Sequence, residues 1–103
     1  MTDAGSEAAA DASIGALRRT LPIGNKRGLH ARAAAKFVRT AGQFDALVRV
    51  SFKGQEVSGL SIMGLMMLSA GIGSEIEVSC SGKQATDAMA ALSALVEGKF
   101  GEE

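Results

Sequence analysis

Several residue types are scarce in this chain, and each scarcity excludes a class of protein. Histidine, cysteine and proline occur once each among the 103 residues, and tryptophan and tyrosine are absent. A single cysteine, Cys80, excludes a disulfide within the chain. One histidine and one cysteine also give no metal-ligand spacing. We therefore expect no metal site and no cofactor.

Membrane and secretion signals are also missing. No apolar run approaches the ~20 residues that a membrane-spanning helix needs. Residues 1–16 carry three acidic side chains and no basic one, whereas a secretory signal has a basic start followed by an apolar stretch. These absences predict a reducing, cytoplasmic location and no membrane partner.

The chain length suits one compact domain and not two. Residues 1–15 are rich in Ala, Ser, Gly and Asp and show no useful periodicity, which is typical of a flexible tail. We therefore expect an N-terminal tail at residues 1–15 and one folded domain at residues 16–100.

The charges are distributed unevenly although they sum to zero. Residues 18–53 contain nine basic side chains and one acidic one, whereas residues 54–103 contain two basic and seven acidic ones. Such a basic segment favours an anionic ligand or an acidic partner. Nucleic acid is a weaker candidate, because the phenylalanines of this segment fit the core pattern. Five basic residues lie close in sequence to His30: Lys26, Arg27, Arg32, Lys36 and Arg39.

Hydrophobic periodicity divides the rest of the chain into seven elements. Alternating apolar residues predict strands near residues 17–23, 44–52, 55–57 and 76–80. Apolar residues spaced by three and four predict three helices. One has His30 at or just before its first turn and ends at about Gly42, and the other two lie near residues 62–68 and 83–97.

The order βαββαβα predicts an α+β fold. We expect a two-layer, open-faced sandwich in which helices cover one face of a four-stranded antiparallel sheet. Pro22 cannot donate a hydrogen bond to a neighbouring strand, so the first strand should lie at a sheet edge. Cys80 alternates with Ile76 and Val78 and is expected in the core.

The segment around His30 has the chemistry of an anion site. The first turn of the expected helix exposes the backbone N–H groups of Ala31 and Arg32 and carries the positive end of the helix dipole. The Arg32 guanidinium has the geometry that a phosphate group requires. A neutral imidazole there is a suitable nucleophile, but the sequence does not say which ring nitrogen reacts. Taken alone, a histidine at a helix start is more often a capping or surface residue.

Two motifs carry a family resemblance. Gly28-Leu29-His30-Ala31-Arg32-Ala33-Ala34, with its flanking residues, resembles the active-site signature of the HPr phosphocarrier family of the bacterial phosphotransferase system. Ser61-Ile62-Met63-Gly64-Leu65-Met66 is similar to the regulatory-serine motif of the same family. The resemblance runs from about Leu17 to Val96 and implies an HPr-like fold.

The resemblance also implies roles and partners. His30 would accept a phosphoryl group on Nδ1 from Enzyme I and pass it to an EIIA-type protein, with Arg32 stabilising the group in transit. Ser61 would be modified by an HPr kinase/phosphorylase. The protein would be a monomeric, stoichiometric carrier and not a stand-alone catalyst. Many family members have Pro where this chain has Ala33, a departure that resembles the nitrogen-regulatory branch.

The short helix near residues 62–68 suggests a contact surface for these partners. Leu65 and Leu68 are expected to face the core, so Ile62, Met63 and Met66 should form an exposed apolar patch. Methionine adapts to several partners, and we therefore expect this patch to be a docking surface.

Two other hypotheses remain open. The chain could be a regulatory module that binds partners according to the phosphorylation of Ser61, with His30 incidental. It could also be a small ligand-binding α+β domain, although it lacks a convincing pocket-forming loop.

Overall fold

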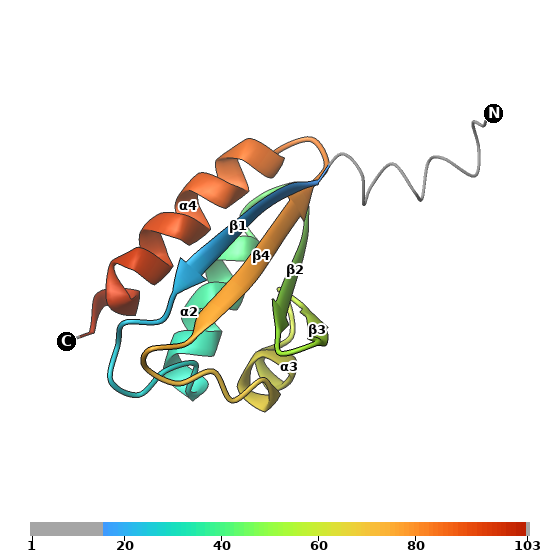
Figure 1. Cartoon of the computed structure of the whole chain (residues 1–103). Coiled ribbons are helices and arrows are strands. Elements are labelled where there is room, and N and C mark those ends of the chain that lie inside the picture. The colour runs from blue at the N-terminus through green and yellow to red at the C-terminus, as the bar shows by residue number, and fades with distance from the viewer. Residues whose placement is uncertain (1–15, 103) are drawn as a thin grey trace.

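A computed structural model describes residues 16–102, so the tail predicted at residues 1–15 lies outside the described part. The described residues alternate strands and helices in the predicted order (Figure 1). The elements are β1 (Leu17–Pro22), α2 (Ala31–Ala41), β2 (Leu47–Phe52), β3 (Gln55–Ser58), α3 (Ile62–Met67), β4 (Glu75–Ser81), α4 (Ala85–Glu97) and the short 3₁₀ turn η1 (Lys99–Gly101).

The four strands form one antiparallel sheet in the order β1-β4-β2-β3. Helices α2 and α4 lie side by side against one face of the sheet, and α3 packs beside α2 and β3 (Figure 1). The predicted α+β sandwich is therefore confirmed. Strand β1 is at an edge, as expected because Pro22 cannot donate to a second neighbour.

The core lies between the sheet and its two long helices. Strand residues Val50, Ile76 and Val78 are fully buried, and Phe37 of α2 and Leu92 of α4 cover them. Cys80 is also fully buried, as predicted, and burial raises the pKa of its thiol. A thiol with a raised pKa forms little thiolate, so Cys80 has the character of a packing residue.

Two elements begin two or more residues later than predicted. The second strand begins at Leu47 and not at Phe44. Here the backbone of Asp45 bonds to Gln84, since its N–H donates to Gln84 Oε1 (2.7 Å) and its C=O accepts from Gln84 N (2.8 Å). Helix α4 begins at Ala85 and not at residue 83, because Gly82 has a left-handed φ of 106° and turns the chain first.

Candidate functional site at the start of helix α2

A tight loop places His30 at the start of α2. Gly28 has a φ of 64°, a left-handed conformation that side chains disfavour. A Cβ atom on Gly28 would also lie 2.4 Å from the carbonyl oxygen of Ala70. This close approach allows Leu29 N to donate to Ala70 O (3.0 Å), and within the turn itself His30 N donates to Gly28 O (2.9 Å). The loop therefore fixes the backbone of His30 before the helix begins.

His30 occupies the N-cap position of α2, but its side chain does not cap the helix. Its backbone carbonyl accepts the first helical bond from Ala34 N (2.8 Å). The N–H groups of Ala31 and Arg32 follow directly and have no acceptor within the helix. The imidazole is thus free for other contacts at the positive end of the helix dipole.

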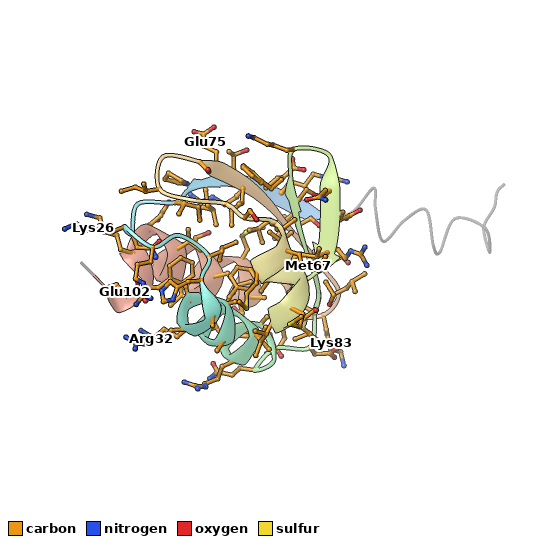
Figure 2. All side chains as sticks on the ribbon, turned by 90° about the horizontal axis from the view of Figure 1, so that it is seen from below. Lys26, Arg32, Met67, Glu75, Lys83 and Glu102 are labelled. Atoms are coloured by element: carbon orange, nitrogen blue, oxygen red, sulfur yellow. The ribbon has the colours of Figure 1, made fainter. Side chains whose placement is uncertain are left out.

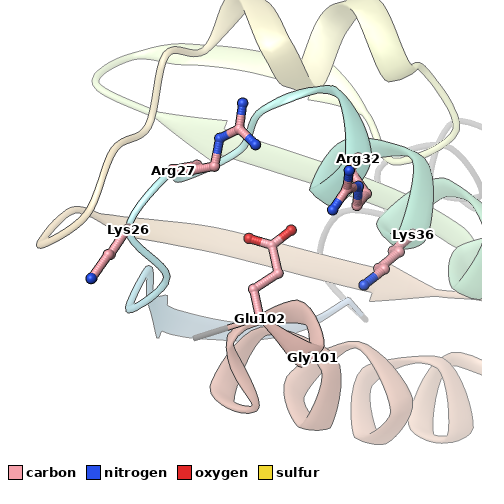
Figure 3. Close-up of a pocket in the computed structure, with 6 residues that line it drawn as sticks. All are labelled: Lys26, Arg27, Arg32, Lys36, Gly101 and Glu102. Carbon is pink, nitrogen blue, oxygen red and sulfur yellow. The ribbon is translucent and has the colours of Figure 1, made fainter.

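Basic side chains surround this helix start. An open pocket of about 460 Å³ lies beside His30, and four of its six lining residues are cationic (Figure 3). The lining comprises Lys26, Arg27, Arg32, Lys36, Gly101 and Glu102. Four of the five basic residues near His30 in sequence thus meet at one place, while Arg39, on the last turn of α2, is not part of the lining. The pocket is large enough to admit a phosphate group, and its positive charge favours an anion.

One acidic residue from the far end of the chain enters this pocket. Glu102 Oε2 lies 2.8 Å from Nε2 of His30, and both side chains are only 17% exposed. Glu102 Oε1 accepts a second hydrogen bond from Asn25 Nδ2 (3.1 Å). Partial burial acts to raise the pKa of Glu102, but the hydrogen bonds from His30 and Asn25 and the charges of His30 and Lys36 outweigh it, so the pKa is lowered.

The turn η1 brings Glu102 to His30. Its three residues, Lys99, Phe100 and Gly101, have left-handed φ values of 58°, 56° and 73°. The backbone turns back toward α2, and Lys36 Nζ donates to Phe100 O (2.6 Å). The side chain of Phe100 is fully buried and anchors the turn in the core.

Ser61 stands at a second helix start. It occupies the N-cap position of α3, and its Oγ accepts a hydrogen bond from Gly64 N (2.9 Å). The sequence predicted Ser61 at this position. Its side chain is half-buried and lies on a different element from His30.

Helix α3 exposes large apolar side chains. Ile62, Met63 and Met66 are 39%, 68% and 38% exposed, whereas Leu65 and Leu68 are buried. Met67 is exposed as well, at 71%, and was not among the residues predicted for the patch. Figure 2 shows Met67 at α3, with Lys26, Arg32 and Glu102 on the other side of the view.

Sequence reasoning found His30, Arg32 and the basic surroundings but missed Glu102 and Asn25. No periodicity links Glu102 to His30, because 72 sequence positions separate them, and the role of Asn25 depends on its bond to Glu102, 77 positions away. One signal was present in the sequence. Phe100 is a large apolar residue just beyond the helix-ending Gly98, which indicates a chain that returns to the core.

Two classes of site are absent from the described residues. No group of three or more His, Cys, Asp or Glu side chains within residues 16–102 is arranged to hold a metal ion. No helix in the same range is long and apolar enough to cross a membrane.

The fold and the pocket together define a class of protein, a small α+β domain that presents one histidine at a helix N-terminus among cationic side chains. Comparison with known proteins gives the family. The family model described as "PTS HPr component phosphorylation site" matches residues 17–98 of this chain. The chain belongs to the HPr phosphocarrier family of the phosphotransferase system.

Individual relatives agree with this assignment. The chain is similar to the phosphocarrier protein HPr of Cupriavidus necator, with 49% identity over 84% of this chain and 97% of the relative. It is 42% identical to the phosphocarrier protein NPr of Shewanella violacea, over 84% of this chain and 94% of that protein. A crystal structure of HPr from Thermoanaerobacter tengcongensis superposes with a TM-score of 0.81 and 42% identity, covering 84% of this chain and 98% of the other.

Proposed function

We propose that this protein accepts a phosphoryl group on His30 from Enzyme I and passes it to an EIIA-type protein in the cytoplasm. Membership of the HPr family supports a phosphocarrier role in the phosphotransferase system. The observation that carries the assignment to His30 is its position. Its imidazole is not used for capping and stands beside a basic pocket at the N-terminus of α2.

The surroundings of His30 suit a phosphoryl group. The unbonded N–H groups of Ala31 and Arg32 and the helix dipole stabilise negative charge at this helix end. The exposed Arg32 guanidinium is close enough to line the same pocket and has two parallel N–H donors for phosphate oxygens. Such preformed donors stabilise the charge of a phosphoryl group during its transfer.

The experiment is phosphorylation by phosphoenolpyruvate and Enzyme I, followed by intact mass measurement. We expect one added phosphate that mild acid removes, and none in His30→Ala. Arg32→Ala should slow the reaction by about tenfold or more. Arg39→Ala is the matched control, because Arg39 is an exposed arginine of the same helix outside the pocket lining. Equal labelling of wild type and His30→Ala would refute the proposal.

We further propose that phosphorylation of Ser61 by an HPr kinase/phosphorylase regulates docking. Phosphate would add a charge of roughly −1.5 to −2 at the start of α3, beside the exposed apolar side chains of Ile62, Met63 and Met66. We assign this surface to partner docking, since methionines adapt to differently shaped partners. The charge would disfavour an apolar contact there by desolvation without unfolding α3.

The test of Ser61 adds the kinase and ATP. An acid-stable phosphate should appear and be absent in Ser61→Ala. Ser58→Ala is the control, because the Ser58 hydroxyl also accepts a backbone N–H nearby, from Leu60 (3.1 Å). Acid-stable label that persists in Ser61→Ala would exclude this serine.

A further inference from the structure

The carboxylate of Glu102 forms a hydrogen bond with one of the two ring nitrogens of His30. The Nε2···Oε2 distance of 2.8 Å is that of a good hydrogen bond. An ionised carboxylate only accepts hydrogen bonds, so the proton of the neutral imidazole must be on Nε2. In this tautomer Nδ1 carries the lone pair.

Asn25 fixes the carboxylate in turn. Its fully buried side-chain amide donates from Nδ2 to Gly28 O (2.9 Å) and to Glu102 Oε1 (3.1 Å). Both partners are acceptors, so the amide nitrogen and not the oxygen must face them. Asn25 thus ties Glu102 to the same loop that fixes the His30 backbone. Glu102, Asn25 and His30 form a connected network that orients the ring.

The backbone before Glu102 is held in place, and its carboxylate lies among positive charges. Phe100 is buried and its carbonyl is bound by Lys36, so the backbone directly before Glu102 is held in place. The carboxylate enters the pocket that is lined by Lys26, Arg27, Arg32 and Lys36, and it contacts His30 (Figure 3). The hydrogen bonds from His30 and Asn25 and the charges of His30 and Lys36 lower the pKa of Glu102, and an ionised carboxylate is the acceptor that Nε2–H requires.

We propose that Glu102 is a positioning residue for phosphoryl transfer, which fixes the Nε2–H form of His30 and leaves Nδ1 as the nucleophile. This inference rests on the function proposed above. The carboxylate does not touch the reacting nitrogen. It acts through the ring, as a carboxylate does when it orients a histidine and stabilises the cation that forms on it.

The transfer step balances without another reactant. The Nδ1 lone pair forms the N–P bond while the bond from phosphorus to the donor breaks, and its electron pair leaves with the donor. The ring becomes a phosphorylated imidazolium whose Nε2 proton stays hydrogen-bonded to Glu102. Onward transfer reverses these changes, since the N–P bond breaks and its electron pair returns to Nδ1. Glu102 stabilises the positive ring in both directions.

The experiment measures the reactivity of the His30 ring without the docking of a partner protein. Potassium phosphoramidate is a small phosphoryl donor that needs no docking surface, and labelling of His30 is followed by intact mass. We expect Glu102→Ala to react about tenfold more slowly, as for the loss of one charge-assisted hydrogen bond. Glu102→Gln, which keeps the shape and removes the charge, should fall between. Glu97→Gln is the matched control, because Glu97 pairs with Arg19 (3.4 Å) on the exposed side of α4.

A second readout tests the hydrogen bond itself. In ¹⁵N-edited spectra at neutral pH, the Nε2–H proton of His30 should be visible in wild type and in Glu97→Gln and lost to exchange in Glu102→Ala. Helix α2 signals should stay in place, which separates positioning from loss of structure.

The outcomes distinguish the two proposals. If wild type is labelled and the Glu102 variants react as fast or faster, Glu102 occupies the pocket without positioning the ring. In that case the role of Glu102 is refuted, while the proposed phosphocarrier function stands. If wild-type His30 is labelled neither by phosphoramidate nor by Enzyme I, both fail. Slower labelling together with loss of the Nε2–H signal supports the inference.

Discussion

At the scale of single residues, the site depends on Gly28 as much as on His30. Gly28 combines a left-handed φ with a backbone contact that leaves no room for a Cβ atom. Its carbonyl also accepts from His30 N and from Asn25 Nδ2. A change at Gly28 therefore alters both the backbone of His30 and the support of Glu102.

Gly28→Ala should destabilise the protein by about 2 kcal/mol or more, because the left-handed conformation alone costs a non-glycine residue roughly 1–2 kcal/mol. Urea unfolding measures this, and His30 labelling should slow in the same variant. The control is Gly71→Ala, since a Cβ atom on the neighbouring Gly71 meets nothing within 4 Å. Equal stability of the two variants would contradict the strain at Gly28.

A site residue could be predicted from the sequence when the features that define it are local, and not when they join distant segments. His30, Arg32 and Ser61 were located because a helix start, a short motif and an N-cap preference are local features. The Glu102–His30 contact was not predicted, because it depends on where two remote segments meet after folding.

At the scale of elements, the turn η1 connects the core to the pocket. Two non-glycine residues, Lys99 and Phe100, adopt left-handed φ values there, each at a cost of roughly 1–2 kcal/mol. Burial of the Phe100 ring and the bond from Lys36 to its carbonyl offset this cost. The turn therefore holds Glu102 only while Phe100 remains in the core.

Phe100→Ala should release η1, at a cost of about 3 kcal/mol, and separate Glu102 from His30. Hydrogen exchange at the N–H groups of Gly101 and Glu102, which bond to Gly98 O (3.0 Å) and Lys99 O (2.9 Å), reports the release. Phe44→Ala is the control, because Phe44 is also packed against the core but belongs to a different segment from η1. Protection of Glu102 N–H that survives in Phe100→Ala would show that the ring is not the anchor.

At the scale of the whole molecule, folding brings the acidic end of the chain into the basic segment near its start. The unfolded chain has no such proximity, so the pKa of Glu102 is lower in the folded state than its ordinary value of 4.5. A lowered carboxyl pKa stabilises the fold above the unfolded-state pKa, and this contribution is lost as pH falls through the folded-state pKa.

Wild type should therefore be more stable than Glu102→Gln at pH 7, and the difference should shrink in acid well below pH 4.5. Thermal unfolding of both proteins across this range measures the effect. High salt should reduce the difference at pH 7, because the pair is partly exposed to solvent. A difference that is independent of pH would mean that Glu102 stabilises the fold by packing and not by charge.

The sequence by itself determined the seven-element order, the edge position of β1, the helix that starts after His30 and the cap at Ser61. These follow from periodicity, proline chemistry and capping, which act over a few residues. Only the tertiary structure decided that β2 starts at Leu47 and that Glu102 reaches His30 and Asn25. Those contacts depend on packing between segments far apart in the chain, where no local pattern selects the partner.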